Sequence, residues 1–323
     1  MIRRLGLAAA LLLTVAPAWA QTTLRLGHVV NEQSNHHILA VGFQEALERL
    51  SDGQITVDIY CCGQLGAGER EQIELLQFGE IDVFAGSTGA LGGFAPLVNV
   101  FDLPFLFRDN DHVDMVIDGP IGRGILDTFE NADIKGLAFA ENGWRNITNS
   151  VRPVASAEDA SGLRLRTMEN RVHLDAWSEL GVNATPMSWG EVRNALQQGV
   201  IDGQENPVNI IHSFALWEVQ DYMSLTRHVF SPSVLLMSLD IYNGFSEEEQ
   251  AWIMQAAQEA STAERQWIRD NENAMLEDIA ERMDVNLEPE MESFRTAMAP
   301  IFAKYEAEFG AALISNILEA GLD

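Results

Sequence analysis

Two neighbouring segments decide the fold: GLRLRTMEN at residues 162–170 and TPMSWGEVRNALQQGVIDGQENP at residues 185–207. In the first, apolar and polar residues alternate up to Arg166, which predicts a strand that ends in an arginine. In the second, Trp189 opens a predicted helix and a polar loop ends at Asn206. A guanidinium can hold a carboxylate through two parallel hydrogen bonds, and an aromatic wall and an amide suit a small polar ligand. These segments therefore combine a predicted strand and helix with the residue types that a pocket for a small carboxylate would use.

Predicted strands and helices alternate on both sides of these segments. Strands are predicted at residues 23–29, 55–60, 81–85, 134–140, 163–166, 200–204 and 234–240. Helices are predicted at residues 35–50, 68–78, 172–180 and 189–198. This alternation favours parallel sheets with right-handed crossovers, and a chain of 323 residues has room for about two domains.

The C-terminal third is predicted to be helical. Ser246 and Glu249 form a capping box, and no Gly or Pro occurs from there to Met283. One helix over this range would be about 55 Å long at 1.5 Å per residue, which exceeds a single lobe of this size. The alternative is two ordinary helices separated near Asn271–Asn273.

Residues 1–20 have the pattern of a secretory signal peptide. Arg3 and Arg4 give a positive start, residues 5–15 are apolar, and Ala18-Trp19-Ala20 fits a cleavage site. The apolar run is too short to span a membrane. We therefore expect cleavage after Ala20, export to the periplasm and no membrane insertion of the remaining chain.

The chain is strongly acidic. It has 20 Lys and Arg against 48 Asp and Glu, a formal net charge of −28. Such a surface repels nucleic acid and anionic lipid, which excludes both as partners. It also repels an anionic ligand, so a carboxylate site needs arginines of its own, and the few arginines in ligand-facing motifs are informative.

Cysteine and histidine spacings predict neither a metal site nor a cofactor site. Cys61 and Cys62 are adjacent, so a vicinal disulfide and two free thiols both remain open. Catalytic motifs are also absent: Ser87 lies in a Gly-Ser-Thr-Gly segment, but Ala85 stands where a nucleophile elbow needs glycine. We therefore do not expect an enzyme, and an exported hydrolase or lyase is the weaker alternative.

Motifs along nearly the whole chain resemble those of one family. Besides the two segments above, they are GQLG at 63–66, FDLPFLFRD at 101–109 and NGWRNITNSVRP at 142–153. Their order and their sequences resemble those of the periplasmic solute-binding proteins of tripartite ATP-independent (TRAP) transporters, the DctP family. The resemblance implies a two-lobed, periplasmic-binding-protein-like α/β fold of type II, with parallel-dominated sheets in each lobe and a long C-terminal helix spanning both.

The resemblance also implies how the chain is divided and what it works with. After the signal peptide, lobe I comprises residues 21–142 plus 232–271, and lobe II comprises residues 143–231 plus 272–323. A ligand in the cleft would be trapped by hinge closure. The implied partner is a membrane permease pair driven by an ion gradient, without an ATPase.

Four ligand contacts are implied in the second lobe. Arg166 matches the arginine that grips the substrate carboxylate, although Thr167-Met168 stands where many members have Val-Pro. Arg145 matches a second ligand-contacting arginine, or else ties its strand to an acidic neighbour. Asn206 matches an amide ligand, with an Asx-type turn before Pro207 as its alternative. Trp189 replaces a common phenylalanine and is expected to form a pocket wall, the alternative being a buried aromatic.

Further contacts are expected around the cleft. His28 ends the first strand, and Ser87 and Thr88 follow the third, at the carboxyl ends where open α/β sheets bind ligands. Glu169 and His173 flank the arginine's turn and could meet ligand hydroxyls. A few members carry a carboxylate where this chain has Gly86, so that contact is not transferred.

These residues predict the binding of a small organic acid. Hydroxyl-capable side chains favour a sugar acid such as a uronate, with a C4-dicarboxylate second; keto acids and aromatic acids also fit the clamp. The main alternative to transport is an exported adaptor that binds the same solute and signals.

Overall fold

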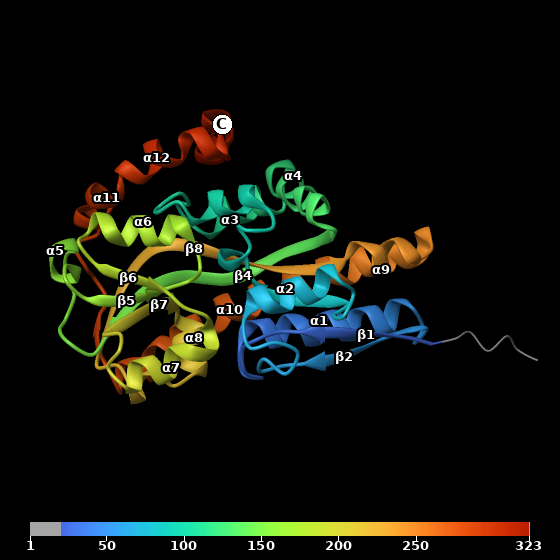
Figure 1. Cartoon of the computed structure of the whole chain (residues 1–323), viewed down its shortest axis with the longest axis horizontal. Coiled ribbons are helices and arrows are strands. Elements are labelled where there is room, and N and C mark those ends of the chain that lie inside the picture. Colours follow the sequence, from blue (N-terminus) through green and yellow to red (C-terminus); the bar gives the residue numbers. More distant parts are fainter. Residues whose placement is uncertain (1–20, 323) are drawn as a thin grey trace, which may run out of the picture.

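The structure, a computed structural model, describes residues 21–322, so the predicted signal peptide lies outside the described residues. It has the two-lobed α/β fold that the sequence predicted (Figure 1). All strands belong to one sheet of nine, in the order β2-β1-β3-β8-β4-β7-β5-β6, with β9 paired to β8. The strands are β1 Thr22–Gly27, β2 Ile55–Tyr60, β3 Val83–Ser87, β4 Ile134–Asn149, β5 Arg164–Thr167, β6 Asn183–Pro186, β7 Gly203–Pro207, β8 Tyr222–Ser238 and β9 Asp284–Asn286.

Helices cover both faces of this sheet. They are α1 Asn35–Leu50, α2 Glu69–Gln77, α3 Asn110–Ile117, α4 Pro120–Asp127, α5 Ala157–Ala160, α6 Arg171–Glu179, α7 Trp189–Gln197, α8 Val208–Ser213, α9 Leu239–Gly244, α10 Glu247–Ala280, α11 Met291–Met298, α12 Pro300–Phe309 and α13 Ala311–Glu319. Apolar side chains of α1 and α10 form a core on one face. Those of α2, α3, α4, α6 and the C-terminal helices α11 to α13 form a larger core on the other.

Two long strands join the lobes. The outer strands of each half pair in parallel, whereas β4 and β8 run antiparallel to each other from Ile134↔Ser238 to Asn149↔Tyr222. The sequence predicted only the short pieces 134–140 and 234–240, because the Glu-Asn-Gly run at 141–143 interrupts the apolar pattern. The strand continues there because Gly143 adopts φ 118° at a register shift, a conformation that glycine tolerates.

The predicted crossing points between the lobes lie at the middle of these strands. Glu141 pairs with Pro232 and Gly143 with Ser231, so the chain would leave lobe I and return to it at adjacent positions. The lobe boundaries stay a prediction. They require the two crossing points to lie side by side, and the pairing of β4 with β8 places them so.

The long helix α10 is continuous, which excludes the two-helix alternative. Ser246 caps it: its backbone N–H donates to Glu249 Oε2 at 2.7 Å and its Oγ accepts from the Glu249 N–H at 3.4 Å. The helix contacts α1 at one end and α8 and β9 towards the other, so it spans both lobes as expected. The approach to α1 is close, because a Cβ on Gly42 would lie 3.4 Å from Ala260.

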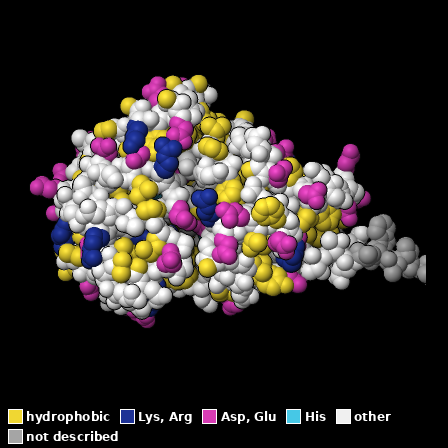
Figure 2. All heavy atoms as spheres, in the orientation of Figure 1, with side chains coloured by type: hydrophobic (Ala, Val, Ile, Leu, Met, Phe, Trp, Pro, Cys, Tyr) yellow, Lys and Arg dark blue, Asp and Glu magenta, His cyan; other side chains and the backbone are white. Residues whose placement is uncertain are grey.

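Charged side chains are abundant on the surface. Asp and Glu are spread over the face shown in Figure 2, with fewer Lys and Arg. Cys61 is buried, Cys62 is exposed, and both are free thiols. Within residues 21–322, no helix is both long and apolar enough to cross a lipid bilayer.

An arginine of α10 ties this helix to the middle of β4. Arg269 Nε donates to Glu141 Oε2 at 2.9 Å, and its two Nη atoms donate to Asp114 at 2.7 and 2.8 Å. Glu141 is buried, which raises its pKa to about 7 even though Arg269 opposes the shift. The ionised form of Glu141 therefore depends on this one guanidinium.

Replacing Arg269 with Gln is expected to lower the free energy of unfolding by about 3 kcal/mol at pH 8, because Glu141 would be left buried and unpaired. The loss should shrink at pH 5, where Glu141 becomes protonated. Arg49→Gln is the matched control: Arg49 also joins α10, through Glu259, but both side chains are exposed, so the loss should stay below about 1 kcal/mol. Urea unfolding at both pH values measures the difference, and equal losses in the two variants would contradict it.

Candidate functional site

A narrow cavity lies where the two lobes meet. Its volume is only about 20 Å³. Its lining residues are Val29, Val30, His36, Glu69, Ser87, Asn142, Arg145, Arg166, Met168, Trp189, Asn206 and Ile210. They come from the segments that follow β1 and β5, the carboxyl end of β3, the starts of α1, α2 and α7, helix α8, and strands β4, β5 and β7. Segments at the carboxyl ends of strands are where open α/β sheets bind ligands.

Arg166 is buried and held in a fixed orientation. Its Nε and Nη2 donate to the carbonyl oxygen of Met187 at 2.9 and 2.7 Å, and the guanidinium lies 5.7 Å from the ring centre of Trp189. Nη1 has no hydrogen bond to any described residue. Burial lowers the pKa of Arg166 to about 10, so the group is still cationic at neutral pH. It can donate to an anion through its remaining N–H groups.

Arg145 is tied to an acidic neighbour, which is one of its two predicted roles, and it also lines the cavity. It is fully buried and forms an ion pair with Glu205 through Nε and Nη2. Its Nη1, however, is buried without a hydrogen-bond partner among the described residues, and the side chain lines the cavity. Burial alone would raise the pKa of Glu205, but Arg145 and the hydrogen bond from His228 bring it below its usual value.

Asn206 and Ser87 complete the predicted residues that line the cavity. Asn206 Oδ1 accepts from Arg145 Nη2 at 3.3 Å, and its Nδ2 donates to Gln204 Oε1. Its side chain therefore forms hydrogen bonds with other side chains, whereas an Asx turn would require a hydrogen bond to the backbone. Ser87 Oγ lies 3.1 Å from Ser231 Oγ on β8. Both side chains are thus fixed by neighbours on the long strands.

Four predicted contact residues do not line the cavity. His28 Nε2 lies 3.1 Å from His37 Nδ1, and Thr88 donates to the Pro232 carbonyl at 3.1 Å. Glu169 is exposed. His173 lies behind Arg145, with its Nε2 3.0 Å from Asp102 Oδ1 and its Nδ1 3.8 Å from Glu205 Oε1. His28, Thr88 and His173 are thus turned towards other protein groups, and Glu169 is turned towards solvent.

Two polar residues that sequence reasoning did not select line the cavity instead. Both ring nitrogens of His36 are buried with no partner among the described residues, and burial lowers its pKa to about 3, so the ring is neutral. Glu69 Oε1 accepts from the Ser87 N–H at 2.9 Å, and burial raises the pKa of Glu69 to about 7. Each opens a helix that follows a parallel strand, and that position is the signal that could have identified them.

The arrangement can bind a small hydroxylated anion. Two guanidinium groups present free N–H donors on one side, and neutral or near-neutral polar groups of His36 and Glu69 can meet hydroxyls. Val29, Ile210 and Trp189 supply apolar walls. Among residues 21–322, no group of three or more His, Cys, Asp or Glu is placed to hold a metal ion.

Known proteins match this chain over most of its length. The family described as bacterial extracellular solute-binding protein, family 7 (DctP), matches residues 26–308. A solute-binding protein of Verminephrobacter eiseniae is 37% identical over 94% of this chain and 91% of its own. A TRAP periplasmic solute-binding protein of Polaromonas, bound to D-erythronate, superposes with a TM-score of 0.92 at 39% identity, over 94% of this chain and all of its own. One from Bordetella, whose density was interpreted as pantoate, superposes with a TM-score of 0.91 at 40% identity, over 93% and 99%.

Glu69 gives the site a pH dependence that can be measured. Its pKa in the folded protein, about 7, lies above the usual 4.5. The contribution of Glu69 to the free energy of unfolding is therefore fully present below pH 4.5 and is lost as pH rises through 7. Relative to Glu69→Gln, the wild type should therefore lose roughly 1–3 kcal/mol of unfolding free energy between pH 4.5 and 8.

Glu74→Gln is the control, because Glu74 is an exposed glutamate on the same helix. Its substitution should leave the pH profile of chemical unfolding unchanged. Parallel profiles for wild type and Glu69→Gln would show that Glu69 titrates normally.

Proposed function

This chain belongs to bacterial extracellular solute-binding protein family 7, the DctP proteins of TRAP transporters, and we propose that it captures a small hydroxylated organic acid and delivers it to a membrane permease. Members of this family are periplasmic proteins that bind solutes for transporters. For this chain the proposal includes export by the signal peptide, cleavage after Ala20 and the absence of a catalytic step.

The observation that carries the proposal is the pair of buried arginines. Arg166 is anchored on the Met187 carbonyl with Nη1 free, and Arg145 is anchored on Glu205 with Nη1 unpartnered. Buried cations with unused donors in one cavity favour an anionic ligand, because leaving them without a partner is costly. A carboxylate is the group that a guanidinium matches in shape.

A hydroxylated monocarboxylate fits the cavity better than a dicarboxylate. The wall contributed by Glu69 and His36 has no lysine or arginine to receive a second carboxylate, and an ionised Glu69 would repel it. Hydroxyls can bond to both side chains. The cavity is also narrow, and D-erythronate and pantoate, found in two similar structures, are both short hydroxylated monocarboxylates. We therefore favour a short sugar acid over a uronate, with a C4-dicarboxylate as the second candidate.

The lobes are joined in a way that suits capture by closure. Strands β4 and β8 and helix α10 all pass between them, so they can bend together while each lobe stays rigid. A ligand drives closure only if it binds the closed form better. Ligand groups that contact Arg166 in one lobe and His36 and Glu69 in the other would do so.

A thermal-shift screen of the purified chain tests the proposal. D-Erythronate, pantoate, glucuronate and succinate are the probes, and each is paired with its methyl ester. A true ligand at 100 times its Kd should add ~2.7 kcal/mol to the free energy of unfolding, whereas its ester should add almost none. Equal stabilisation by acid and ester would overturn the assignment of the two arginines.

Arg166→Lys should weaken binding of the best acid at least about 100-fold by calorimetry while the fold is retained, because an ammonium cannot reproduce the planar fork. Arg164→Lys is the control: it lies two residues earlier on β5, is exposed and pairs with Asp202. An affinity of Arg166→Lys within about threefold of wild type would contradict the role of Arg166.

A further inference from the structure

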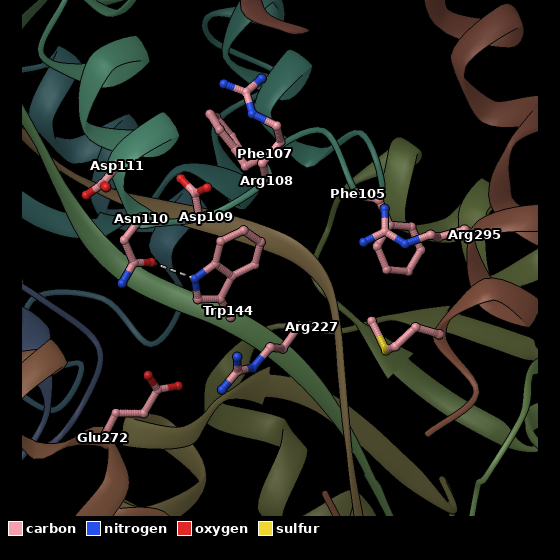
Figure 3. A pocket seen from close by; sticks show the side chains of 11 residues that line it. Phe105, Phe107, Arg108, Asp109, Asn110, Asp111, Trp144, Arg227, Glu272 and Arg295 are labelled. Carbon is pink, nitrogen blue, oxygen red and sulfur yellow. Dashed lines mark hydrogen bonds between the residues drawn. The ribbon is translucent and has the colours of Figure 1, made fainter. Parts of the chain in front are cut away.

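The cavity between the lobes is short of space, whereas a wider groove elsewhere is short of converging charge. That groove opens at the surface with a volume of about 460 Å³ (Figure 3). Its Arg227 is directed towards Glu272, and its Arg295 lies apart from both, over the Phe105 ring at 4.6 Å (Figure 3). Between the lobes, two guanidinium groups line one cavity of only about 20 Å³. Space rather than charge therefore limits which acid can bind there.

Most side chains that line the cavity between the lobes cannot yield space. Its two arginines, Asn206, Ser87 and Glu69 are held by hydrogen bonds to neighbouring protein groups. Its valines and its isoleucine are branched at Cβ, which restricts their rotamers. Met168 differs from all of these, because a methionine is unbranched and adapts its shape to the space around it. How much room a ligand has therefore depends most on Met168.

Met168 reaches from one predicted lobe to the other. It lies in the segment that follows β5, two residues after Arg166, and only 5% of it is exposed. Its sulfur lies 3.7 Å from the Oγ of Ser87, at the carboxyl end of β3. A Cβ on Gly89 would lie 2.7 Å from this sulfur and 3.1 Å from the Met168 Cε. The thioether thus fills the space that the missing side chain of Gly89 leaves.

We propose that Met168 is the residue that sets the chain length of the acid bound between the lobes, an inference that rests on the proposed function. In so small a cavity, a ligand held by the arginines also contacts Met168. The thioether can turn aside for a short acid, because its bonds rotate. Its atoms stay in the cavity, however, and occupy the space that a longer acid needs.

D-Erythronate and galactonate test this inference, because both are hydroxylated monocarboxylates and galactonate has the longer carbon chain. Calorimetry on the purified chain should show at least about tenfold tighter binding of D-erythronate by the wild type, since even one methylene group that does not fit a pocket costs about this much. Met168→Ala should shift the ratio of the two affinities at least about tenfold towards galactonate. Met168→Leu keeps the volume of the side chain and should retain the preference of the wild type.

Met283→Ala is the matched control. Met283 is 6% exposed, close to the value for Met168, but it belongs to a separate apolar cluster beyond the end of α10. Its substitution removes the same atoms and should leave the ratio of the two affinities unchanged. If Met168→Ala does not fold, Met168→Val takes its place, because it also shortens the side chain, and the same shift towards galactonate is expected.

The outcomes separate this inference from the proposed function. If the wild type prefers D-erythronate and the shortened Met168 variants keep that preference, the role of Met168 is wrong and the proposed function stands. Equal binding of the two acids by the wild type, or binding of neither, overturns the role of Met168 as well. A wild type that binds none of the acids in the thermal-shift screen overturns the proposed function too.

Discussion

The buried ion pair between Arg145 and Glu205 is the interaction on which the rest of the site depends. Both side chains are fully buried, and a charge left alone in such a place costs several kcal/mol. Glu205 occupies one edge of the guanidinium, so the Nη1 edge is left to face the cavity. His228, at 3.1 Å from Glu205 Oε2, and Asn206 fix this orientation. In a chain of net charge −28, this ion pair keeps the Arg145 guanidinium charged and in place beside the cavity that we propose binds an anion.

The strands that carry this interaction are also the ones that join the lobes. Arg145 lies on β4, His228 and Ser231 lie on β8, and Glu205 follows on β7, paired to β4. In the proposed function, the contacts that would hold the ligand and the segments that would bend during closure are therefore the same pieces of chain. The continuous helix α10 packs on α1 and α8 at once, so it would limit the direction of the bending that we propose.

Two motifs, read with the family resemblance, predicted part of the lining of the cavity. Arg166, Trp189 and Asn206 lie in two short motifs, and the structure places all three around one cavity. The long strands were underestimated, because polar residues such as Glu141 and Asn142 are buried in them by partners distant in sequence, Arg269 and Asn35 among them. His36 and Glu69 were missed for the same reason. Their position in the cavity depends on how separate strand ends meet, and the sequence marked it only by their place at the start of a helix that follows a predicted strand.

The most direct test of the account is a crystal structure with the acid that stabilises the protein most. The account predicts that a carboxylate oxygen lies within about 3 Å of Nη1 of Arg166, with Nη1 of Arg145 also in contact. It predicts that ligand hydroxyls face Glu69 and His36. A ligand whose carboxylate lies outside hydrogen-bonding distance of Arg166 would contradict it.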